Sequence, residues 1–168
     1  MRTATLLLLP ALVLPAQDTG IPGATEVARG VLVLRGLPNP EVCRALKAQR
    51  ITHVVDLRRD DEPDLDCTSE ARRMTELGIH YLRYALRPVI PAEDFDFLRA
   101  FLQGLPPHAR VVLHCATGNR AAGAVGPWLV LDRGMPREEA LRIIRGAGLT
   151  EPETERSVGT YLEPRARN

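Results

Sequence analysis

LHCATGNRAAG (Leu113–Gly123) joins an apolar run to a largely apolar helical segment through a loop that contains a cysteine, a glycine and an arginine. The residues before this loop predict a short strand over Arg110–His114, and those after it predict a helix over Asn119–Leu131 that ends at Gly134. In α/β folds, ligands bind beyond the carboxyl ends of such strands. The function therefore depends on whether Cys115 is a buried thiol or a nucleophile.

The rest of the chain alternates strands and helices in the same way. Apolar, β-branched runs predict strands over Val31–Leu34, Ile51–Leu57 and Ile79–Leu86, and helical periodicity predicts helices over Glu41–Gln49, Ser69–Leu77, Ala92–Leu105 and from Pro136 to about Arg145. Thr68 or Asp66 is the expected N-cap of the second of these helices. This alternation predicts one α/β domain with a mainly parallel central sheet flanked by helices.

The composition excludes a broad attraction to polyanions. The 168 residues include 22 Lys+Arg and 21 Asp+Glu, which gives a formal net charge of +1. No excess of positive charge points to nucleic acid, so any bound anion must be held by a local site. The cysteine and histidine spacing is not that of a metal site, and we expect no metal and no organic cofactor.

The first residues, MRTATLLLLPALVLPAQ, differ from the rest of the chain. A short positive start, an apolar run and small residues before a polar segment predict a secretory signal peptide over residues 1–17. The remaining residues, 18–168, then form a single exported domain, periplasmic or secreted, with no stable membrane insertion after cleavage. The alternative is that this segment is a buried strand or helix. The sequence does not indicate the oligomeric state.

Export affects how the three cysteines are interpreted. In an oxidising compartment Cys43 and Cys67 can pair in a disulfide, which leaves Cys115 as the free thiol. The alternative is that Cys43 is a small, buried and unpaired apolar residue.

The loop after Cys115 has the chemical features of an oxyanion site. A tight turn before a helix points backbone N–H groups inward, and Gly118 allows the backbone geometry that such a turn requires. Arg120 can donate two parallel hydrogen bonds to a phosphate or sulfate. The same donors are expected to favour a thiolate at Cys115, which is the arrangement for covalent phosphoryl transfer. The alternative is an inert core thiol beside a surface arginine.

HCATGNR (His114–Arg120) resembles the phosphate-binding signature of the cysteine-dependent protein tyrosine and dual-specificity phosphatases. The likeness covers roughly Val31 to Leu149 and is closest to the bacterial beta-lactamase-hydrolase-like branch, which also has a shortened loop. It includes ITHVVDLR (Ile51–Arg58), GIHYLRYALRP (Gly78–Pro88) and PWLVLDRGMPREEALRIIRGAGL (Pro127–Leu149).

The resemblance implies a protein tyrosine phosphatase-like fold and hydrolysis of phosphomonoesters, on a phosphoprotein or a small phosphate ester, through a phosphocysteine. Cys115 would be the nucleophile. The loop Ala116, Thr117, Gly118, Asn119 and Arg120 would bind the phosphate. His114, Asp56 and Arg58 would support the site, with the ring of His114 either tuning the thiolate or simply packed at the end of its strand.

The chain departs from the phosphatase pattern at three points. Four residues separate Cys115 from Arg120, where the phosphatases have five. Ala121 replaces the usual Ser or Thr after the arginine. The segment Leu86–Pro91 contains no acid, so Asp94 is the first candidate for the general acid, although Asp94 and Asp96 also suit the start of a helix.

Two other functions account for these departures. A rhodanese-like sulfurtransferase would carry a persulfide on Cys115 and would need no general acid. Its loop also has six residues from cysteine to arginine, but the segment after the helix follows the phosphatase pattern. A non-catalytic oxyanion-binding module is the third possibility. Binding alone, however, does not require a thiolate beside Arg120.

Overall fold

The structure, a computed structural model, describes residues 19–62 and 65–163. The predicted signal peptide, residues 1–17, lies outside these ranges. Within them, no helix is long and apolar enough to cross a membrane.

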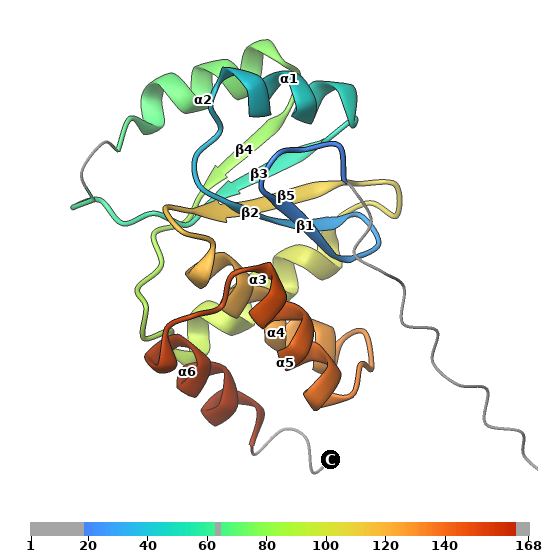
Figure 1. The fold of residues 1–168 in the computed structure, drawn as a ribbon, viewed down its shortest axis with the longest axis vertical. Helices are drawn as coiled ribbons and strands as arrows, with labels where there is room; N and C mark the ends of the chain where they lie inside the picture. The colour runs from blue at the N-terminus through green and yellow to red at the C-terminus, as the bar shows by residue number, and fades with distance from the viewer. Residues whose placement is uncertain (1–18, 63–64, 164–168) are drawn as a thin grey trace, which may run out of the picture.

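A five-stranded sheet forms the centre of the domain (Figure 1). Its strands lie in the order β1-β2-β5-β3-β4. β1 is antiparallel to β2, and the other neighbouring pairs are parallel, which confirms the mainly parallel sheet. The strands are β1 (Ala24–Ala28), β2 (Val31–Arg35), β3 (His53–Asp56), β4 (His80–Arg83) and β5 (Val111–Cys115). The carboxyl ends of β2, β3, β4 and β5 therefore meet at one edge of the sheet.

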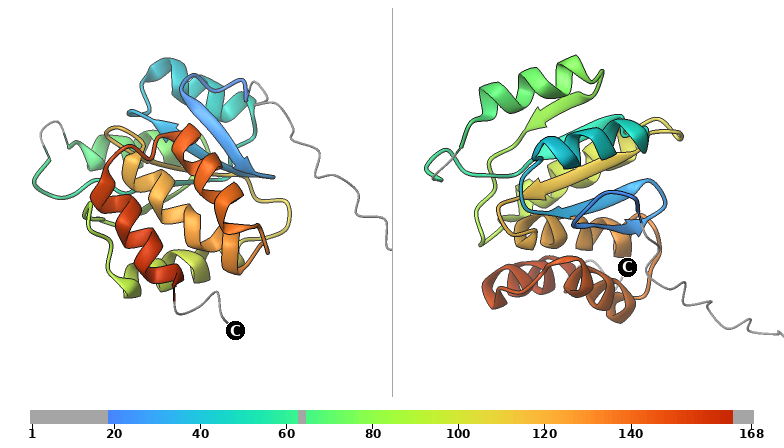
Figure 2. Two further views of the ribbon diagram at one scale, coloured as in Figure 1. Left: turned by 60° about the horizontal axis from the view of Figure 1, so that its bottom comes forward. Right: turned by 45° about the horizontal axis from the view of Figure 1, so that its top comes forward.

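Helices cover both faces of this sheet (Figure 1 and Figure 2). α1 (Pro40–Ala48) and α2 (Cys67–Glu76) lie on one face; α3 (Ala92–Gly104), α4 (Asn119–Leu131), α5 (Arg137–Ala147) and α6 (Pro152–Leu162) lie on the other. Of the two predicted N-caps for α2, Asp66 is the one used, since its side chain accepts a hydrogen bond from Ser69 N at 3.0 Å.

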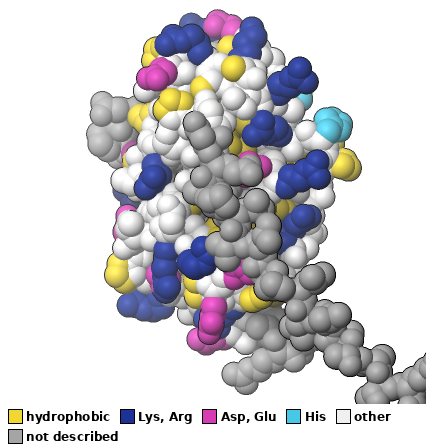
Figure 3. All heavy atoms as spheres, turned by 45° about the vertical axis from the view of Figure 1, so that its right-hand side comes forward, with side chains coloured by type: hydrophobic (Ala, Val, Ile, Leu, Met, Phe, Trp, Pro, Cys, Tyr) yellow, Lys and Arg dark blue, Asp and Glu magenta, His cyan; other side chains and the backbone are white. Residues whose placement is uncertain are grey.

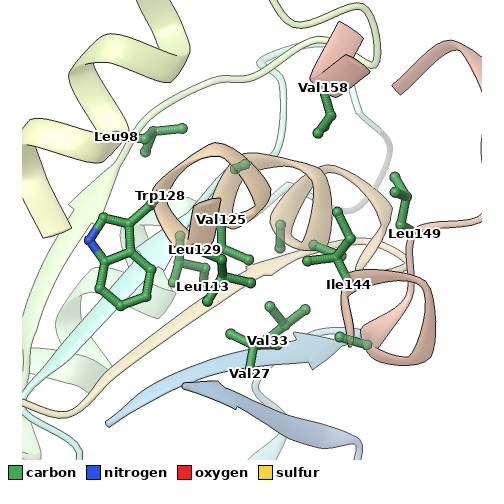
Figure 4. Packing of buried hydrophobic residues seen from close by; sticks show 14 of the residues in the cluster. Val27, Val33, Leu98, Leu113, Val125, Trp128, Leu129, Ile144, Leu149 and Val158 are labelled. Atoms are coloured by element: carbon green, nitrogen blue, oxygen red, sulfur yellow. The ribbon is translucent and has the colours of Figure 1, made fainter. Parts of the chain in front are cut away.

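Successive side chains of the buried strands point to opposite faces of the sheet, so the hydrophobic core has two parts. Val33 and Leu113 pack with α3 to α6, whereas Leu32 and Val112 pack with α1 and α2. Figure 4 shows the first of these clusters gathered around α4. A strand that is apolar on both faces reads as a continuous apolar run, and this is why β2, β3 and β5 were predictable.

α4 is the central helix of the domain and places the candidate loop at its N-terminus. Every residue from Asn119 to Leu129 is buried, because the helix is enclosed by the sheet and by α3, α5 and α6. A Cβ at Gly123 would lie 2.6 Å from Thr154 Cγ2, and one at Gly126 would lie 2.9 Å from Ile144 Cδ1. These two glycines permit the close approach of α5 and α6.

Two elements are missing from the sequence prediction, and two predicted strands, Ile51–Leu57 and Ile79–Leu86, are too long. β1 is a short edge strand with a half-exposed pattern, and α6 is polar over much of its surface, so neither gives a strong apolar signal. The strand predicted over Ile79–Leu86 is confined to His80–Arg83. The chain then leaves the sheet, although Leu86 N still donates to Leu57 O at 3.2 Å.

The expected disulfide between Cys43 and Cys67 is not formed, and all three cysteines carry free thiols. Cys43 is buried in the cluster beneath α1, where its sulfur donates to Pro38 O at 3.4 Å. Cys67 is the half-buried first residue of α2. The alternative for Cys43, a small buried apolar residue, describes the structure.

Candidate active site

Cys115 ends β5, and its side chain faces both the apolar core and the loop. The residue is 0% exposed and packs within the cluster around α4. Its Sγ nevertheless accepts a hydrogen bond from Gly118 N at 3.2 Å. Gly118 caps α4 in the left-handed conformation, with φ of 89°, and this turns its amide back toward the sulfur. The thiol therefore has a polar contact with the loop that an inert core cysteine would lack.

The start of the loop is open to solvent. Ala116 and Thr117 are exposed, whereas Gly118, Asn119 and Arg120 are buried. Among the described residues, the amides of Ala116 and Thr117 have no hydrogen-bond acceptor. With the N-terminus of α4 directly behind them, these amides are available to an anion.

Arg120 points into the site, which excludes the alternative of a surface arginine. It is 8% exposed, and its Nη1 donates to Leu57 O at 3.2 Å and to Leu86 O at 3.1 Å. These carbonyls follow β3 and β4. Burial alone would lower the pKa of Arg120, but the hydrogen bond to Glu62 and the charge of Cys115 outweigh it and raise the pKa. Arg120 is therefore a fixed cation at the end of the loop.

The guanidinium of Arg120 is paired with Glu62, a residue for which the sequence alone predicts no role in the site. Nη2 lies 2.9 Å from Oε2, and Nη1 donates to Oε1. Glu62 also accepts from Arg59 N at 2.7 Å. A carboxylate thus occupies the arginine fork expected to hold the oxyanion. The available signal was the position of this acidic loop, because it follows β3, which neighbours β5.

A buried ionic cluster surrounds His114, the residue directly before Cys115. Asp56 pairs with His114 in the β3–β5 register. Arg58 Nε donates to Asp56 Oδ1 at 2.9 Å, and Arg58 Nη2 donates to Asp56 Oδ2 at 2.6 Å and to Glu70 Oε2 at 2.5 Å. His114 Nε2 lies 2.8 Å from Glu70 Oε1, and Tyr81 OH donates to Asp56 Oδ2 at 2.8 Å.

This cluster brings together the three residues predicted to support the site and adds Glu70 from α2. Burial alone would raise the pKa of Asp56, but hydrogen bonds from Arg58 and the charge of His114 outweigh it and lower the pKa. Ligand atoms of Asp56, Glu70 and His114 lie within 4.8 Å of one another. Since Arg58 already bonds both carboxylates, the arrangement is that of an ion-pair network rather than of an open metal site.

The side chain of Asn119 is anchored away from any substrate. Its Nδ2 donates to Thr154 Oγ1 at 2.7 Å, and its Oδ1 accepts from Thr150 N at 3.0 Å and Glu151 N at 2.9 Å. The loop is thereby tied to the start of α6. The predicted contact of Asn119 with substrate is left to its backbone.

Asp94 and Asp96 each bind a tyrosine. Tyr84 OH donates to Asp94 Oδ1 at 2.5 Å, and Tyr161 OH donates to Asp96 Oδ1. Burial, followed by the hydrogen bond to Asp94, raises the pKa of Tyr84 to about 12. Asp94 lies in the first turn of α3 and acts as an acceptor there. The tyrosine hydroxyl occupies Oδ1 and favours the ionised carboxylate, whereas a general acid must hold a proton to give.

Solved structures of phosphatases are similar to this chain over most of its length. No protein-family model and no curated protein matches the sequence. A protein from Shewanella putrefaciens CN-32, described as a DUF442 phosphatase, superimposes with a TM-score of 0.68 at 20% identity and covers 86% of this chain and 94% of its own.

Two structures with bound ligands show the same likeness. PTPMT1 in complex with PI(5)P has a TM-score of 0.69 at 19% identity, covering 86% of this chain and 98% of its own. TpbA from P. aeruginosa in complex with pTyr has a TM-score of 0.64 at 19% identity, covering 89% and 87%. At these identities the comparison shows the fold alone. The chain has the fold of the cysteine-dependent protein tyrosine phosphatase superfamily.

Proposed function

We propose that this protein is a cysteine-dependent phosphatase that hydrolyses phosphomonoesters. The observation that carries the proposal is the hydrogen bond of 3.2 Å from Gly118 N to Cys115 Sγ, in a loop that ends at the buried cation of Arg120. The phosphatase fold supports this assignment. So do the ligands named for two similar structures, PI(5)P and pTyr, which both carry phosphate.

The reaction proceeds in two displacements at phosphorus. The Cys115 thiolate attacks, an S–P bond forms and the ester P–O bond breaks, so that the leaving oxygen departs with the bonding electrons and takes up a proton. Water then attacks the phosphocysteine, the S–P bond breaks, and inorganic phosphate leaves while the thiolate is restored. Arg120 and the amides of Ala116 and Thr117 hold the nonbridging oxygens in both steps.

Arg120 must exchange one anion for another before the first step. Its fork is occupied by Glu62, and Cys115 is fully buried. A phosphate dianion can accept the same pair of hydrogen bonds as the carboxylate and carries more charge. Substrate binding therefore consists of displacing Glu62 from the guanidinium.

The leaving group decides which phosphomonoesters react readily. Asp94 remains a weak candidate for the acid because it accepts a hydrogen bond from Tyr84. Aryl phosphates leave as phenolates of low basicity and depend less on protonation than alkyl phosphates do. We therefore expect aryl phosphates to be the better substrates and Asp94→Asn to change their kcat only slightly.

Two assays on one purified sample test the function. We expect hydrolysis of p-nitrophenyl phosphate by the native chain, its loss in Cys115→Ser, and a fall of about 10²-fold in kcat in Arg120→Lys, because lysine lacks the planar fork. Cys43→Ser serves as the matched control, since Cys43 packs beneath α1 away from the loop.

The second assay measures thiocyanate from thiosulfate and cyanide. Activity in this assay alone would make the protein a persulfide sulfurtransferase. If neither assay shows turnover and calorimetry still detects binding of inorganic phosphate, the protein is the oxyanion-binding module. Either result overturns the phosphatase assignment.

A further inference from the structure

Arg35 lies beside the candidate loop and has no part in the mechanism above. It is the last residue of β2 and pairs with Cys115 in the parallel β2–β5 register. Its side chain is exposed. Because β3 lies on the other side of β5, Arg35 flanks the loop opposite to Arg120 and its partners from the segments after β3 and β4.

Two glycines make a slot for the stem of Arg35. A Cβ at Gly118 would lie 2.7 Å from Arg35 Cγ, and a Cβ at Gly148 would lie 3.2 Å from the same atom and 3.3 Å from Cδ. Both glycines have positive φ, of 89° and 132°, and real Cβ atoms do not approach other heavy atoms as closely as the first distance. The stem is thus packed between the candidate loop and the end of α5, which holds its base in place.

The guanidinium at the end of this stem is unpaired. Within residues 19–62 and 65–163, Arg35 makes no ion pair and no side-chain hydrogen bond. Arg58 and Arg120, which are both buried, are bonded to carboxylates. Arg35 is therefore a cation fixed by its stem at the edge of an anion site, with its donors unused.

We infer that Arg35 selects substrates by binding a second phosphate group, so that the preferred substrate carries one phosphate in the loop and another near the carboxyl end of β2. This inference rests on the proposed function. A phosphomonoester needs one arginine fork, which Arg120 supplies, whereas a second dianion needs a second donor group close to the first. The packed stem lowers the entropy that Arg35 loses when it binds.

The test compares anions with one and two phosphonate groups as inhibitors of p-nitrophenyl phosphate hydrolysis. The probes are methylphosphonate, methylenediphosphonate and 1,3-propylenediphosphonate, none of which the enzyme can hydrolyse. We expect at least one diphosphonate to bind about tenfold more tightly than methylphosphonate. In Arg35→Met, which keeps an unbranched stem for the slot, this preference should disappear; Arg35→Lys, which keeps the charge, should retain part of it.

Arg29→Met is the matched control. Arg29 is an exposed arginine at the other end of the β1–β2 hairpin, so its loss removes the same charge without touching the loop. The control should leave all inhibition constants unchanged, and thermal melts should show that each variant is folded. The inference is overturned if the native protein binds the mono- and diphosphonates equally, or if Arg35→Met weakens both to the same extent.

Binding measured by calorimetry with the same three probes separates this inference from the proposed function. If the protein hydrolyses no p-nitrophenyl phosphate, the proposed function fails. The diphosphonate preference and its dependence on Arg35 are still measurable.

Discussion

At the scale of single residues, the pairing of Arg120 with Glu62 dominates the site. Both terminal nitrogens of the guanidinium face the carboxylate, so the charge of the cation that we propose binds phosphate is already balanced. Burial alone would raise the pKa of Glu62, but the hydrogen bond from Arg120 outweighs it and lowers the pKa. Glu62 is therefore charged at neutral pH, and under the proposed function it competes with the substrate phosphate for the same donors.

We expect Glu62→Gln to lower KM for p-nitrophenyl phosphate by roughly threefold to tenfold. An uncharged amide still fills the space but holds the guanidinium less strongly than a carboxylate does, so phosphate displaces it more easily. Initial-rate kinetics at fixed ionic strength measure the change. Asp61→Asn is the control, because Asp61 is an exposed acid of the same loop that pairs with Arg59 and not with Arg120. A rise in KM would instead mean that Glu62 positions Arg120 for substrate.

At the scale of elements, the domain depends on the contact between α4 and α6. Gly123 lies against Thr154, a fully buried residue whose hydroxyl accepts from Asn119. Thr154 therefore both packs against α4 and anchors the loop through Asn119.

We expect Gly123→Ala to lower the free energy of unfolding by about 1–2 kcal/mol. The new methyl group overlaps Thr154, and the cost of this overlap exceeds the stability gained from the higher helix propensity of alanine. Gly146→Ala provides the comparison. Gly146 lies in α5 with nothing within 4 Å of the new Cβ, so this change should stabilise the chain by up to about 1 kcal/mol. Urea unfolding measures both. Equal effects of the two substitutions would show that α4 and α6 can separate enough to accommodate the methyl group.

The ionic cluster joins β3, β5 and α2 and should make stability depend on acid. The pKa of Asp56 is lowered from 3.8 in the folded state. Its stabilising contribution is therefore complete above that usual value and is lost as the pH falls through the lowered one.

We expect Asp56→Asn to cost about 3–5 kcal/mol at pH 7, because Arg58 and His114 stay buried with one carboxylate fewer. We also expect the loss of stability on acidification below about pH 4 to be smaller in this variant than in the native chain. Urea titrations from pH 7 to pH 3 measure both effects. Parallel pH profiles for the two proteins would exclude Asp56 as a source of the acid sensitivity.

At the scale of the whole molecule, the formal net charge is +1, and charged side chains stand at both ends of the parallel strands. Figure 3 looks onto the side where the parallel strands begin, and it shows Lys and Arg side chains spread over that face with Asp and Glu side chains among them. Arg29 and Arg110 stand just before β2 and β5. The acids Asp60, Asp61 and Glu62 follow β3 at its other end, near the candidate site. The proposed recognition of phosphate at that end therefore depends on the donors of the loop and on Arg35, which lies beside it.

The sequence was sufficient for the fold because β2, β3 and β5 are apolar on both faces and the helices between them are strongly periodic. It was also sufficient to place Cys115, Arg120 and Asp56 at one edge, since parallel strands end together. Glu62 and Arg35 could not be assigned in this way. Their roles depend on contacts with α4 and Gly148, more than 50 residues away in sequence, and no local pattern encodes such contacts.

The free thiols give a further prediction for the intact chain. We expect three thiols per chain to react with Ellman's reagent in guanidinium without a reductant, because no pair is bonded in the structure. In the native state Cys67 should react first, since it is half-buried. Cys43 should be slow, because burial raises the pKa of its thiol. A count of one thiol would contradict the structure and support the disulfide expected between Cys43 and Cys67.

The complete burial of Cys115 has a consequence for its reaction with oxidants. Peroxide and alkylating agents attack a sulfur only where they can touch it, and here no part of the side chain is exposed. An enzyme that uncovers its sulfur only while an anion has drawn Arg120 away from Glu62 would spend its idle time in a form that resists oxidative inactivation. Oxidation of Cys115 would then increase with the number of catalytic cycles and not with the time that the protein has existed.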